Sequence, residues 1–439
     1  MYIAREIDPL LQAWKAEPGR KPLLLRGVRQ CGKTSCVRNL GASFDHYIEI
    51  NLEKTPSLHR LFEGDLDVRR MVSLLEIETG QPVVPGRSLL FIDEIQACPR
   101  AILALRYLYE DLPELHVIAA GSLLEFVLKN PRQKQKIDFP VGRTRSLYLY
   151  PFSFREFLRG TGQERLCEYL DQLHPETEPN VLHEKLLEQY QAFLLVGGMP
   201  EAIVKYRQTG SFLACQAVHR DIILNFRDDF GKYDDHIPGD MIRKVFDYAI
   251  RHVCSQTKSL SAIPGLSAYY FSECVSLLQK AGLVFPVRAS SCDTLPLGTG
   301  GKEANQKLLF FDTGVYLTEC GLDTAGLLAA EAFDEMNKGS VVEMQTGLEL
   351  IKSANPYGEA SLFYWYRSGA NAEVDYVIEK DSAPVPVEVK ASGKGSMQSM
   401  TAFLERFPDT PYGIRVSLED FSSCDRIRVC PVYAVSRLK

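Results

Sequence analysis

The stretch Gly27-Val28-Arg29-Gln30-Cys31-Gly32-Lys33-Thr34 decides the fold of this chain. It fits the pattern G-x-x-x-x-G-K-[ST] and stands between a short apolar run at 22–26 and a helical pattern at 33–40. Glycines at these positions let backbone N–H groups curl around phosphate oxygens, which the start of the following helix also attracts. We therefore expect a phosphate-binding loop whose nucleotide contacts come from Gly27, Arg29, Gln30, Cys31, Gly32, Lys33, Thr34 and Ser35.

Two side chains of this loop have specific chemical roles. Lys33 is expected to neutralise the β- and γ-phosphate oxygens of a nucleotide, which makes it part of the catalytic set. The Thr34 hydroxyl is expected to bind Mg²⁺. The loop therefore predicts ATP and Mg²⁺ as the cofactors.

A second motif, Leu89-Leu90-Phe91-Ile92-Asp93-Glu94, is an apolar run that ends in two acidic residues. Asp93 is placed to hold Mg²⁺ directly or through water, and Glu94 to orient or deprotonate the attacking water. The alternative, acidic residues that only cap the next helix, is disfavoured by the loop upstream. A further predicted strand at 46–51 separates the two motifs, which favours hydrolysis over kinase-type transfer.

Short apolar runs alternate with helical patterns through the first third of the chain. Strands are expected at 22–26, 46–51, 88–92, 115–120 and 146–150, with helices between them. This alternation with short loops is typical of an α/β domain with a parallel sheet. We assign residues 1–151 to this ATP-binding domain.

Two more residues of this domain are candidates for the hydrolytic site. Ser122 follows the fourth predicted strand and is placed to touch the γ-phosphate or the water, or else to cap the next helix. Arg143 is placed to supply a cation to the transition state, in cis or from a neighbouring subunit, or else is a solvated surface residue. A role in trans would require an oligomer.

The remaining chain divides by the kind of pattern it shows. Residues 152–232 carry apolar residues at helical spacing and predict a helical lid or linker. Helical patterns followed by two apolar runs over 233–325 predict a winged helix-turn-helix. A helix, three strands and a final helix and strand over 326–439 predict a separate α/β domain.

Several motifs together resemble one family, the prokaryotic AAA+-like ATPases related to archaeal-type ATPases. The resemblance begins with the phosphate-binding loop and extends over nearly the whole chain. The other motifs that carry it are Tyr2-Ile3-x-Arg5, Phe91-Ile92-Asp93-Glu94-Ile95-Gln96, Ala120-Gly121-Ser122, Pro151-Phe152-Ser153-Phe154-x-Glu156-Phe157, Gly197-Gly198-Met199-Pro200-Glu201, Phe311-Asp312-Thr313-Gly314, and the block from Tyr364-Trp365-Tyr366-Arg367 to Glu388-Val389-Lys390.

The resemblance implies a fold for each part of the chain. It implies a P-loop NTPase sheet of the ASCE/AAA+ type, a winged helix, and a C-terminal restriction-endonuclease-like α/β domain similar to PD-(D/E)xK nucleases. The sequence departs from the common pattern at Cys31, where a small aliphatic residue is usual, and at Ala120, where threonine is usual. Ala120 removes one hydroxyl near Ser122.

The C-terminal domain carries a pattern of carboxylates and lysine that fits this nuclease resemblance. Glu388 and Lys390 share one face of a strand and can converge with Asp375 from the neighbouring strand. Asp375 and Glu388 are then candidate ligands of a second Mg²⁺ site, with Lys390 polarising the water. Glu343, on the preceding helix, resembles the extra acid of such nucleases. The competing interpretation is a retained fold that only binds a protein partner or DNA.

Composition limits the classes of partner. The chain has 439 residues, with 50 Lys and Arg against 56 Asp and Glu, a net charge of −6. This balance lacks the global positive charge of a dedicated nucleic-acid binder, so any DNA contact must come from a local patch. No signal-peptide pattern and no apolar run of about 18 residues occurs, so we expect a cytoplasmic protein with no membrane partner.

Two functions follow from these patterns. The first is an ATP-hydrolysing enzyme that couples its nucleotide state to the winged-helix and nuclease-like domains and acts on DNA. The second is a nucleotide-gated switch that binds a protein or DNA through a catalytically inactive nuclease-like domain.

Overall fold

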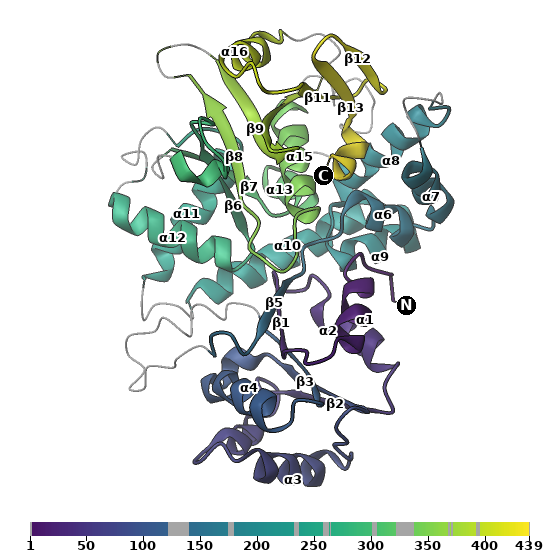
Figure 1. Ribbon diagram of the computed structural model, residues 1–439, viewed down its shortest axis with the longest axis vertical. Coiled ribbons are helices and arrows are strands. Elements are labelled where there is room, and N and C mark those ends of the chain that lie inside the picture. Colours follow the sequence, from purple (N-terminus) through teal and green to yellow (C-terminus); the bar gives the residue numbers. More distant parts are fainter. Residues whose placement is uncertain are drawn as a thin grey trace.

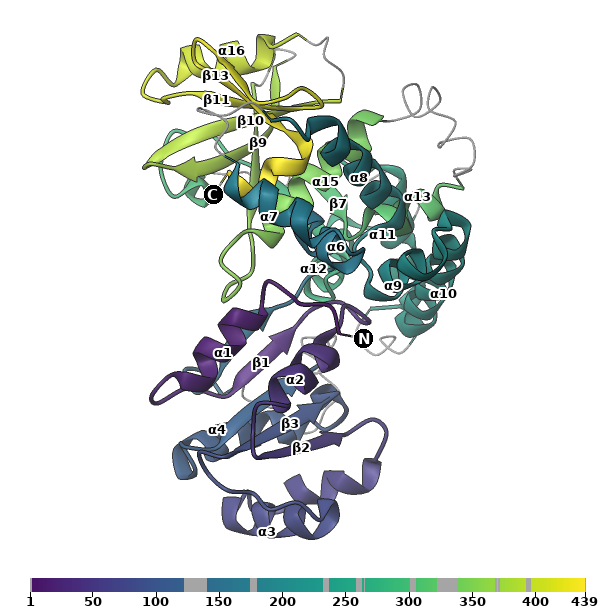
Figure 2. The ribbon, with the colours of Figure 1, turned by 90° about the vertical axis from the view of Figure 1, so that its right-hand side faces the viewer.

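The computed structural model shows two sheets at opposite ends of an elongated molecule, with helices between them (Figures 1 and 2). It describes residues 2–121, 140–173, 180–231, 237–257, 263, 265–300, 305–321, 338–367, 369, 372–391 and 396–438. Within these residues, no helix is long and apolar enough to cross a membrane.

The N-terminal sheet has five strands that all pair in parallel, in the order β2-β3-β4-β1-β5. Because these strands are parallel, the loops that follow β1 and β3 leave the same edge of the sheet, on either side of β4. This arrangement confirms the predicted parallel α/β sheet. The strands are β1 (Leu23–Arg26), β2 (His46–Asn51), β3 (Ser88–Asp93), β4 (His116–Ala120) and β5 (Arg145–Tyr148).

Helices cover both faces of this sheet, which explains why β3 and β4 are buried along their whole length. Alternate strand residues point to opposite faces: Leu89 and Phe91 belong to one hydrophobic cluster, and Leu90 and Ile92 to another. The first cluster includes residues of helices α1 (Asp8–Ala16) and α2 (Lys33–Gly41). The second includes residues of α3 (Val68–Thr79), α4 (Pro99–Asp111) and the short 3₁₀ helices η1 (Pro56–Phe62) and η2 (Ile95–Ala97).

The next five helices of the described chain lie between the two sheets and along one side of the second sheet (Figure 1). Ser153 and Glu156 start the first of them with a reciprocal capping box, in which each side chain accepts from the other residue's backbone N–H. The helical character predicted for 152–232 is therefore present. The helices are α6 (Phe154–Gly160), α7 (Glu164–Gln172), α8 (His183–Val196), α9 (Pro200–Thr209) and α10 (Phe212–Phe230).

The break between α8 and α9 exists because a carboxylate from a distant segment enters it. The Asp312 side chain accepts from the Gly198 N–H (2.6 Å) and from the Val315 N–H (3.0 Å) at the start of α13 (Thr313–Glu319). Gly197 has φ +72°, and a Cβ there would lie 2.1 Å from Asp312 Oδ1. Only glycine leaves room for this contact.

The second sheet has eight strands in the order β12-β13-β11-β10-β9-β8-β6-β7. The sequence placed the β6–β7 hairpin in a winged helix separate from the C-terminal domain. In the structure β6 pairs in parallel with β8, so the hairpin forms the edge of the C-terminal sheet. The strands are β6 (Val284–Ala289), β7 (Gln306–Phe310), β8 (Leu362–Tyr366), β9 (Glu373–Lys380), β10 (Ala383–Lys390), β11 (Gly413–Ser417), β12 (Ser422–Cys424) and β13 (Ile427–Pro431).

The helices around this sheet connect it to the rest of the chain. Tyr433 in η7 (Val432–Arg437) bonds through its hydroxyl to Asn180 (2.5 Å) and to His183 of α8 (2.8 Å). The loop between α15 and β8 reaches the N-terminal sheet, where the Tyr148 N–H donates to Pro356 O (2.8 Å). The helices are α11 (Gly239–Arg251), α12 (Ala268–Lys280), α15 (Lys338–Lys352) and α16 (Gln398–Arg406), with the short η5 (Leu297–Gly300).

Candidate functional site

The phosphate-binding loop, residues 27–34, links β1 to α2 through left-handed backbone. Gly27 has φ +151°, and a Cβ there would lie 2.1 Å from Leu149 O on the segment after β5. Gln30 (φ 63°) and Gly32 (φ 99°) are also left-handed, and Gly32 caps the N-terminus of α2. The loop therefore folds tightly around the start of a helix, the backbone geometry that binds phosphate.

Lys33 points back over this loop. Its ammonium donates to the backbone oxygens of Gly27 (2.8 Å) and Val28 (2.9 Å), and the residue is buried. The charge is thus held on the concave side of the loop. A phosphate bound there would find the ammonium already in place.

Thr34 and Asp93 meet across the sheet edge. The Thr34 hydroxyl donates to Asp93 Oδ2 (3.1 Å), which also accepts from the Asn51 side-chain amide (3.4 Å). Burial and the neighbouring Glu94 raise the pKa of Asp93, while Thr34 lowers it. A hydroxyl and a carboxylate in contact are hard oxygen donors of the kind Mg²⁺ prefers, so these two residues fit the predicted ion.

Glu94 stands at the turn directly after β3. Its backbone is left-handed (φ 50°), and its carboxylate accepts from the Gln96 side-chain amide. Sequence reasoning identified Glu94 but assigned no role to Gln96 or Asn51. Gln96 lies within one of the motifs that carry the family resemblance, so the sequence did contain a signal for it. Asn51 is the last residue of β2, the strand that pairs with β3.

A cavity of about 670 Å³ opens at this edge of the sheet. One wall is the loop from Arg29 to Ser35 together with Asp93 and Glu94, and the opposite wall comes from α9 and α10. The α10 side includes Ile222, Asn225, Asp228 and Asp229. The helices predicted as a lid therefore face the phosphate-binding loop.

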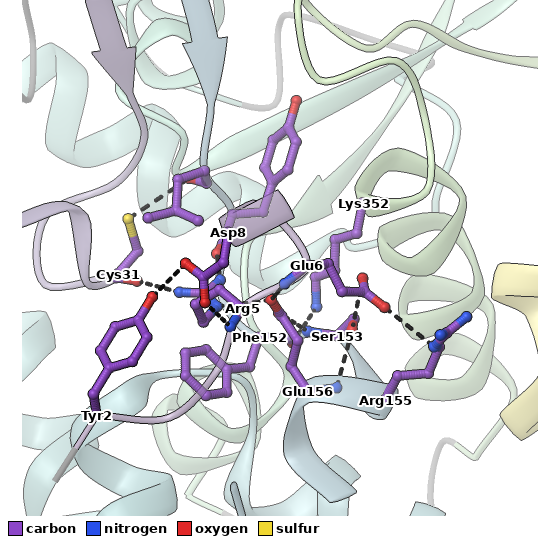
Figure 3. Close-up of polar contacts among 12 residues, drawn as sticks. Tyr2, Arg5, Glu6, Asp8, Cys31, Phe152, Ser153, Arg155, Glu156 and Lys352 are labelled. Atoms are coloured by element: carbon purple, nitrogen blue, oxygen red, sulfur yellow. Dashed lines mark hydrogen bonds and ion pairs between the residues drawn. The ribbon is translucent and has the colours of Figure 1, made fainter. Parts of the chain in front are cut away.

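A second cavity of about 630 Å³ adjoins the first, because Gly32, Ser35, Pro200 and Glu201 line both. Its other walls are side chains of the N-terminal segment, α2 and the lid, most of them apolar or aromatic. They include Tyr2, Ile3, Cys36, Phe152 and Val204. Tyr2 is held by a hydrogen bond from its hydroxyl to Asp8 Oδ1 (2.6 Å; Figure 3).

Arg29 ties the loop to the lid. Its guanidinium forms an ion pair with Asp229 at the end of α10 and lies 3.6 Å from Glu53 Oε2. The nucleotide-binding loop and α10 are thus joined by a direct charge contact.

Arg5 supports the phosphate-binding loop from the side of the second cavity, which it also lines, a role that sequence reasoning missed. The Arg5 guanidinium donates to Cys31 O in the loop (2.9 Å) and to Glu156 Oε1 (2.8 Å), as Figure 3 shows. It also donates to Tyr150 O (2.7 Å). It also lies 4.0 Å from the centre of the Phe152 ring, and the residue is 4 % exposed. The sequence signal was the Tyr2-Ile3-x-Arg5 motif, which names no partner.

Glu156 anchors this arginine on α6. Its carboxylate also accepts from the N–H groups of Glu6 (2.7 Å) and Ser153 (2.9 Å). Burial opposes its ionisation, but Arg5 and these donors outweigh burial and hold the pKa of Glu156 below its usual value. The pair is therefore a fully bonded buried ion pair.

The same segment continues to helix α15. Glu349 Oε1 accepts from the Phe154 N–H (3.1 Å) and the Gln345 side-chain amide (2.9 Å), while the Lys352 ammonium donates to Phe152 O (2.9 Å). A continuous set of polar contacts thus runs from the phosphate-binding loop to the C-terminal region.

Glu349 should make the stability of the protein depend on pH. Burial is the largest cause that raises its pKa, to about 7 from 4.5, and Lys352 opposes it. The folded state then binds the proton more tightly than the unfolded chain does. The free energy of unfolding should therefore decrease as pH rises from about 4.5 through about 7, by at most about 3 kcal/mol. Glu349→Gln should lack this contribution.

Urea denaturation of both proteins at about pH 5 and about pH 8 checks this expectation. The Gln variant should gain stability relative to the wild type at the higher pH. Glu405→Gln, at an exposed position on α16, is the control and should follow the wild type. An unchanged pH dependence in Glu349→Gln would contradict the assignment.

Two further residues were predicted for the hydrolytic site, and the structure describes only one of them. Ser122 lies outside the described residues. Arg143 donates through Nε to Glu110 Oε1 (2.7 Å) at the end of α4, and its side chain is 45 % exposed. Arg145, the first residue of β5, pairs with Leu23, the first residue of β1, so Arg143 lies toward the edge of the sheet opposite the phosphate-binding loop. This position disfavours the predicted role in cis, and the role in trans stays a prediction.

The four C-terminal candidates lie in one region. Glu388 Oε1 is 2.7 Å from the Lys390 ammonium, and Asp375 Oδ2 accepts from the Val389 N–H (2.8 Å) on the same strand. Burial raises the pKa of Asp375 and of Glu388. Glu343, on α15, has a pKa raised to about 8, first by burial and then by Asp375.

A buried lysine from another part of the chain joins this group. Lys307, on β7, has its ammonium 3.1 Å from Glu343 Oε1 and 3.7 Å from Asp375 Oδ1, and it also pairs with Glu373. Sequence reasoning missed Lys307 and Glu373. Lys307 precedes an apolar run in the sequence. The strand pattern predicts that Lys307 is in a strand but does not predict which acidic residues its ammonium contacts.

Comparison with known families matches three regions of the chain. Residues 19–158 match an AAA domain, residues 187–325 a domain of unknown function (DUF8612), and residues 338–435 a domain of unknown function (DUF4143). The chain therefore carries an AAA domain, an assignment that supports ATP binding and hydrolysis. The sequence prediction of an AAA+-like core is confirmed at this level.

Solved structures give more distant likenesses. A Walker-type ATPase of Pyrococcus abyssi is 17 % identical with a TM-score of 0.43, over 72 % of this chain and 95 % of that chain. The ORC1 protein of Aeropyrum pernix, solved in complex with DNA, is 14 % identical with a TM-score of 0.28, over 74 % of this chain and 92 % of that chain. No curated protein matches the sequence.

Proposed function

We propose that this protein is a Mg²⁺-dependent ATPase whose nucleotide state sets the position of helices α9 and α10 and of the C-terminal region. The observation that carries the proposal is the Thr34–Asp93 contact of 3.1 Å, which joins the phosphate-binding loop to the acidic end of β3. It places the two motifs at one cavity, as hydrolysis of a phosphate requires.

The two adjoining cavities suggest how the nucleotide lies. The phosphates bind against the loop N–H groups and the start of α2, where Lys33 exchanges its contacts with backbone oxygens for phosphate oxygens. The base and sugar take the adjoining cavity, against Tyr2 and Val204. Gly32 and Ser35, which line both cavities, lie at the junction.

The residues around Asp93 divide the work of hydrolysis. Thr34 and Asp93 hold Mg²⁺, which when bound with ATP neutralises phosphate charge. Glu94 orients the attacking water and accepts its proton, and Gln96 holds the Glu94 carboxylate in place. Ser122 serves as the polar sensor at the γ-phosphate, and Arg143 supplies a cation in trans, to the site of a neighbouring subunit.

Electrostatic interactions couple nucleotide binding to the position of the lid helix α10. Asp228 and Asp229 line the same cavity as the loop, and Asp229 pairs with Arg29. A triphosphate brings negative charge beside these carboxylates and competes for Arg29, so binding favours a different position of α10. Arg5 and Glu156 transmit the loop position toward α15.

A nucleotide-gated binding switch with a catalytically inactive nuclease-like domain is the second candidate function, favoured by the lysine in the C-terminal carboxylate group. Its target is DNA or a protein. The order α11, α12 and the β6–β7 hairpin favours DNA, as in a winged helix, whereas the net charge of −6 favours a protein. A DNA mobility shift measured with and without ATP separates the two targets.

The ATPase proposal is tested by two substitutions at Thr34. Thr34→Val keeps the shape and removes the hydroxyl, and it should raise the Mg²⁺ concentration for half-maximal phosphate release by roughly 10-fold or more. Thr34→Ser keeps the hydroxyl and should stay near the wild type. Wild-type protein that binds ATP but shows no Mg²⁺-dependent turnover, with or without DNA, would overturn the enzymatic function and leave the switch.

A further inference from the structure

The C-terminal carboxylate cluster, defined as Glu343, Glu373, Asp375 and Glu388, contains a buried ammonium. Lys307 contributes this charge from β7, and its side chain is 2 % exposed. The ammonium contacts Glu343 and Glu373 and lies 3.7 Å from Asp375 Oδ1. It therefore takes the central position among three carboxylates.

The backbone and its neighbours fix Lys307 in this position. It pairs with Val287 across the β6–β7 hairpin and makes a bridge to Gln256 on its other side. The ring of Tyr364, on β8, has its centre 5.2 Å from the ammonium. The lysine stem is enclosed, which keeps the ammonium among the carboxylates.

Oxygens of Asp375 and Glu388 are also engaged. Asp375 Oδ2 accepts from the Val389 N–H (2.8 Å), Glu388 Oε2 accepts from the Met400 N–H (3.1 Å) on α16, and Glu388 Oε1 meets Lys390. In the part of the chain that the structure describes, no three His, Cys, Asp or Glu side chains form a group that could hold a metal ion. Metal ions in proteins need several such oxygens directed at one point.

We propose that Lys307 takes the place of a divalent cation in the C-terminal domain, which makes the carboxylate cluster a metal-independent ionic junction. A divalent ion entering between Glu343 and Asp375 would meet a fixed positive charge at the distance of an ion pair, where repulsion in a buried site is strong. Without metal ions the cluster cannot activate water for phosphodiester cleavage by the route predicted for Asp375, Glu388 and Lys390. The domain then binds its target without cutting it.

The junction also has a structural role. Lys307 lies in the region that matches DUF8612, and the four carboxylates lie in the region that matches DUF4143. The ion pairs join these two regions at the point where β6 pairs with β8. The lysine thus holds the hairpin in the C-terminal sheet and balances the charge of the cluster at the same time.

Metal binding by the full-length, nucleotide-free protein tests the proposal. The probe is Mn²⁺, and its binding is detected by electron paramagnetic resonance and by the shift in the melting temperature of the protein. Lys307→Met should lower the melting temperature and create a Mn²⁺ site that restores it, and the added substitution Asp375→Asn should abolish that site. Lys380→Met is the matched control, because Lys380 is on the same sheet but donates to Leu438 O, and it should bind Mn²⁺ as the wild type does.

The comparison of wild type with Asp375→Asn keeps the test decisive if Lys307→Met does not fold. Both should bind Mn²⁺ equally, and neither should nick supercoiled plasmid with Mg²⁺ or Mn²⁺. Metal binding or cleavage by the wild type that Asp375→Asn removes would overturn the proposal, as would a folded Lys307→Met that gains no Mn²⁺ site. ATP turnover is not a readout here, so either result leaves the proposed ATPase function standing.

Discussion

Replacing Glu94 by Gln is expected to lower the turnover of ATP by at least about 100-fold while tight ATP binding remains. The amide keeps the size of the side chain and its place after Asp93, but it cannot accept the proton of the attacking water. The phosphate-binding loop, with Lys33 over Gly27 and Val28, is untouched by the change. The variant should therefore accumulate as an ATP complex.

Lys33→Ala should instead lose ATP binding, whereas Glu94→Gln keeps it. Removing the ammonium eliminates the charge that meets the phosphates, so ATP binding itself should be lost. Binding of a fluorescent ATP analogue together with single-turnover phosphate release separates the two variants. Glu63→Gln, at an exposed position, is the control and should behave as the wild type. Wild-type turnover in Glu94→Gln, with Lys33→Ala inactive, would place the general base on another residue.

Arg5→Met is expected to destabilise the protein by about 3–5 kcal/mol, because it leaves the Glu156 carboxylate buried without its partner. It should also weaken ATP binding. Arg5 donates to Cys31 O, which positions the loop backbone, and the loss of one charged hydrogen bond corresponds to about 10-fold or more in affinity. Urea unfolding and ATP titration measure the two effects separately.

The double variant Arg5→Met/Glu156→Gln distinguishes support of the loop from general stability. The glutamine removes the uncompensated charge and can still accept from the Ser153 and Glu6 N–H groups, so stability should largely return. ATP affinity should stay weak, because no group replaces the contact with Cys31 O. Recovery of affinity together with stability would show that Arg5 acts only on the fold. Arg5→Lys should keep the fold but lose part of the affinity, because lysine lacks the planar fork.

Much of the N-terminal domain was predictable because its signals are local. The strand expected at 46–51 is β2, His46–Asn51, and the phosphate-binding loop lies between β1 and α2 as its pattern required. Buried parallel strands read as continuous apolar runs, and glycines mark the left-handed turns. The same holds for Thr34 and Asp93, whose meeting follows from the shared edge of a parallel sheet.

The predicted separation of the winged helix from the C-terminal domain shows that local sequence patterns do not predict which strands pair across a long distance in the chain. The β6–β7 hairpin was expected from its two apolar runs, and it is present. Its parallel partner β8 begins more than fifty residues after β7 ends, and no periodicity in either strand specifies that pairing. Which sheet a hairpin joins depends on the packing of the whole domain.

The sequence by itself determined the chemistry at the phosphate-binding loop, since glycine conformation, helix start and strand burial depend on residues close together in the chain. Only the tertiary structure decided the partners of the buried charges. Arg5 meets Glu156 across 151 residues, and Lys307 meets Glu343 across 36. A charge taken out of water must find a partner, but the folded topology selects which one, because many acidic residues of the chain satisfy the same need.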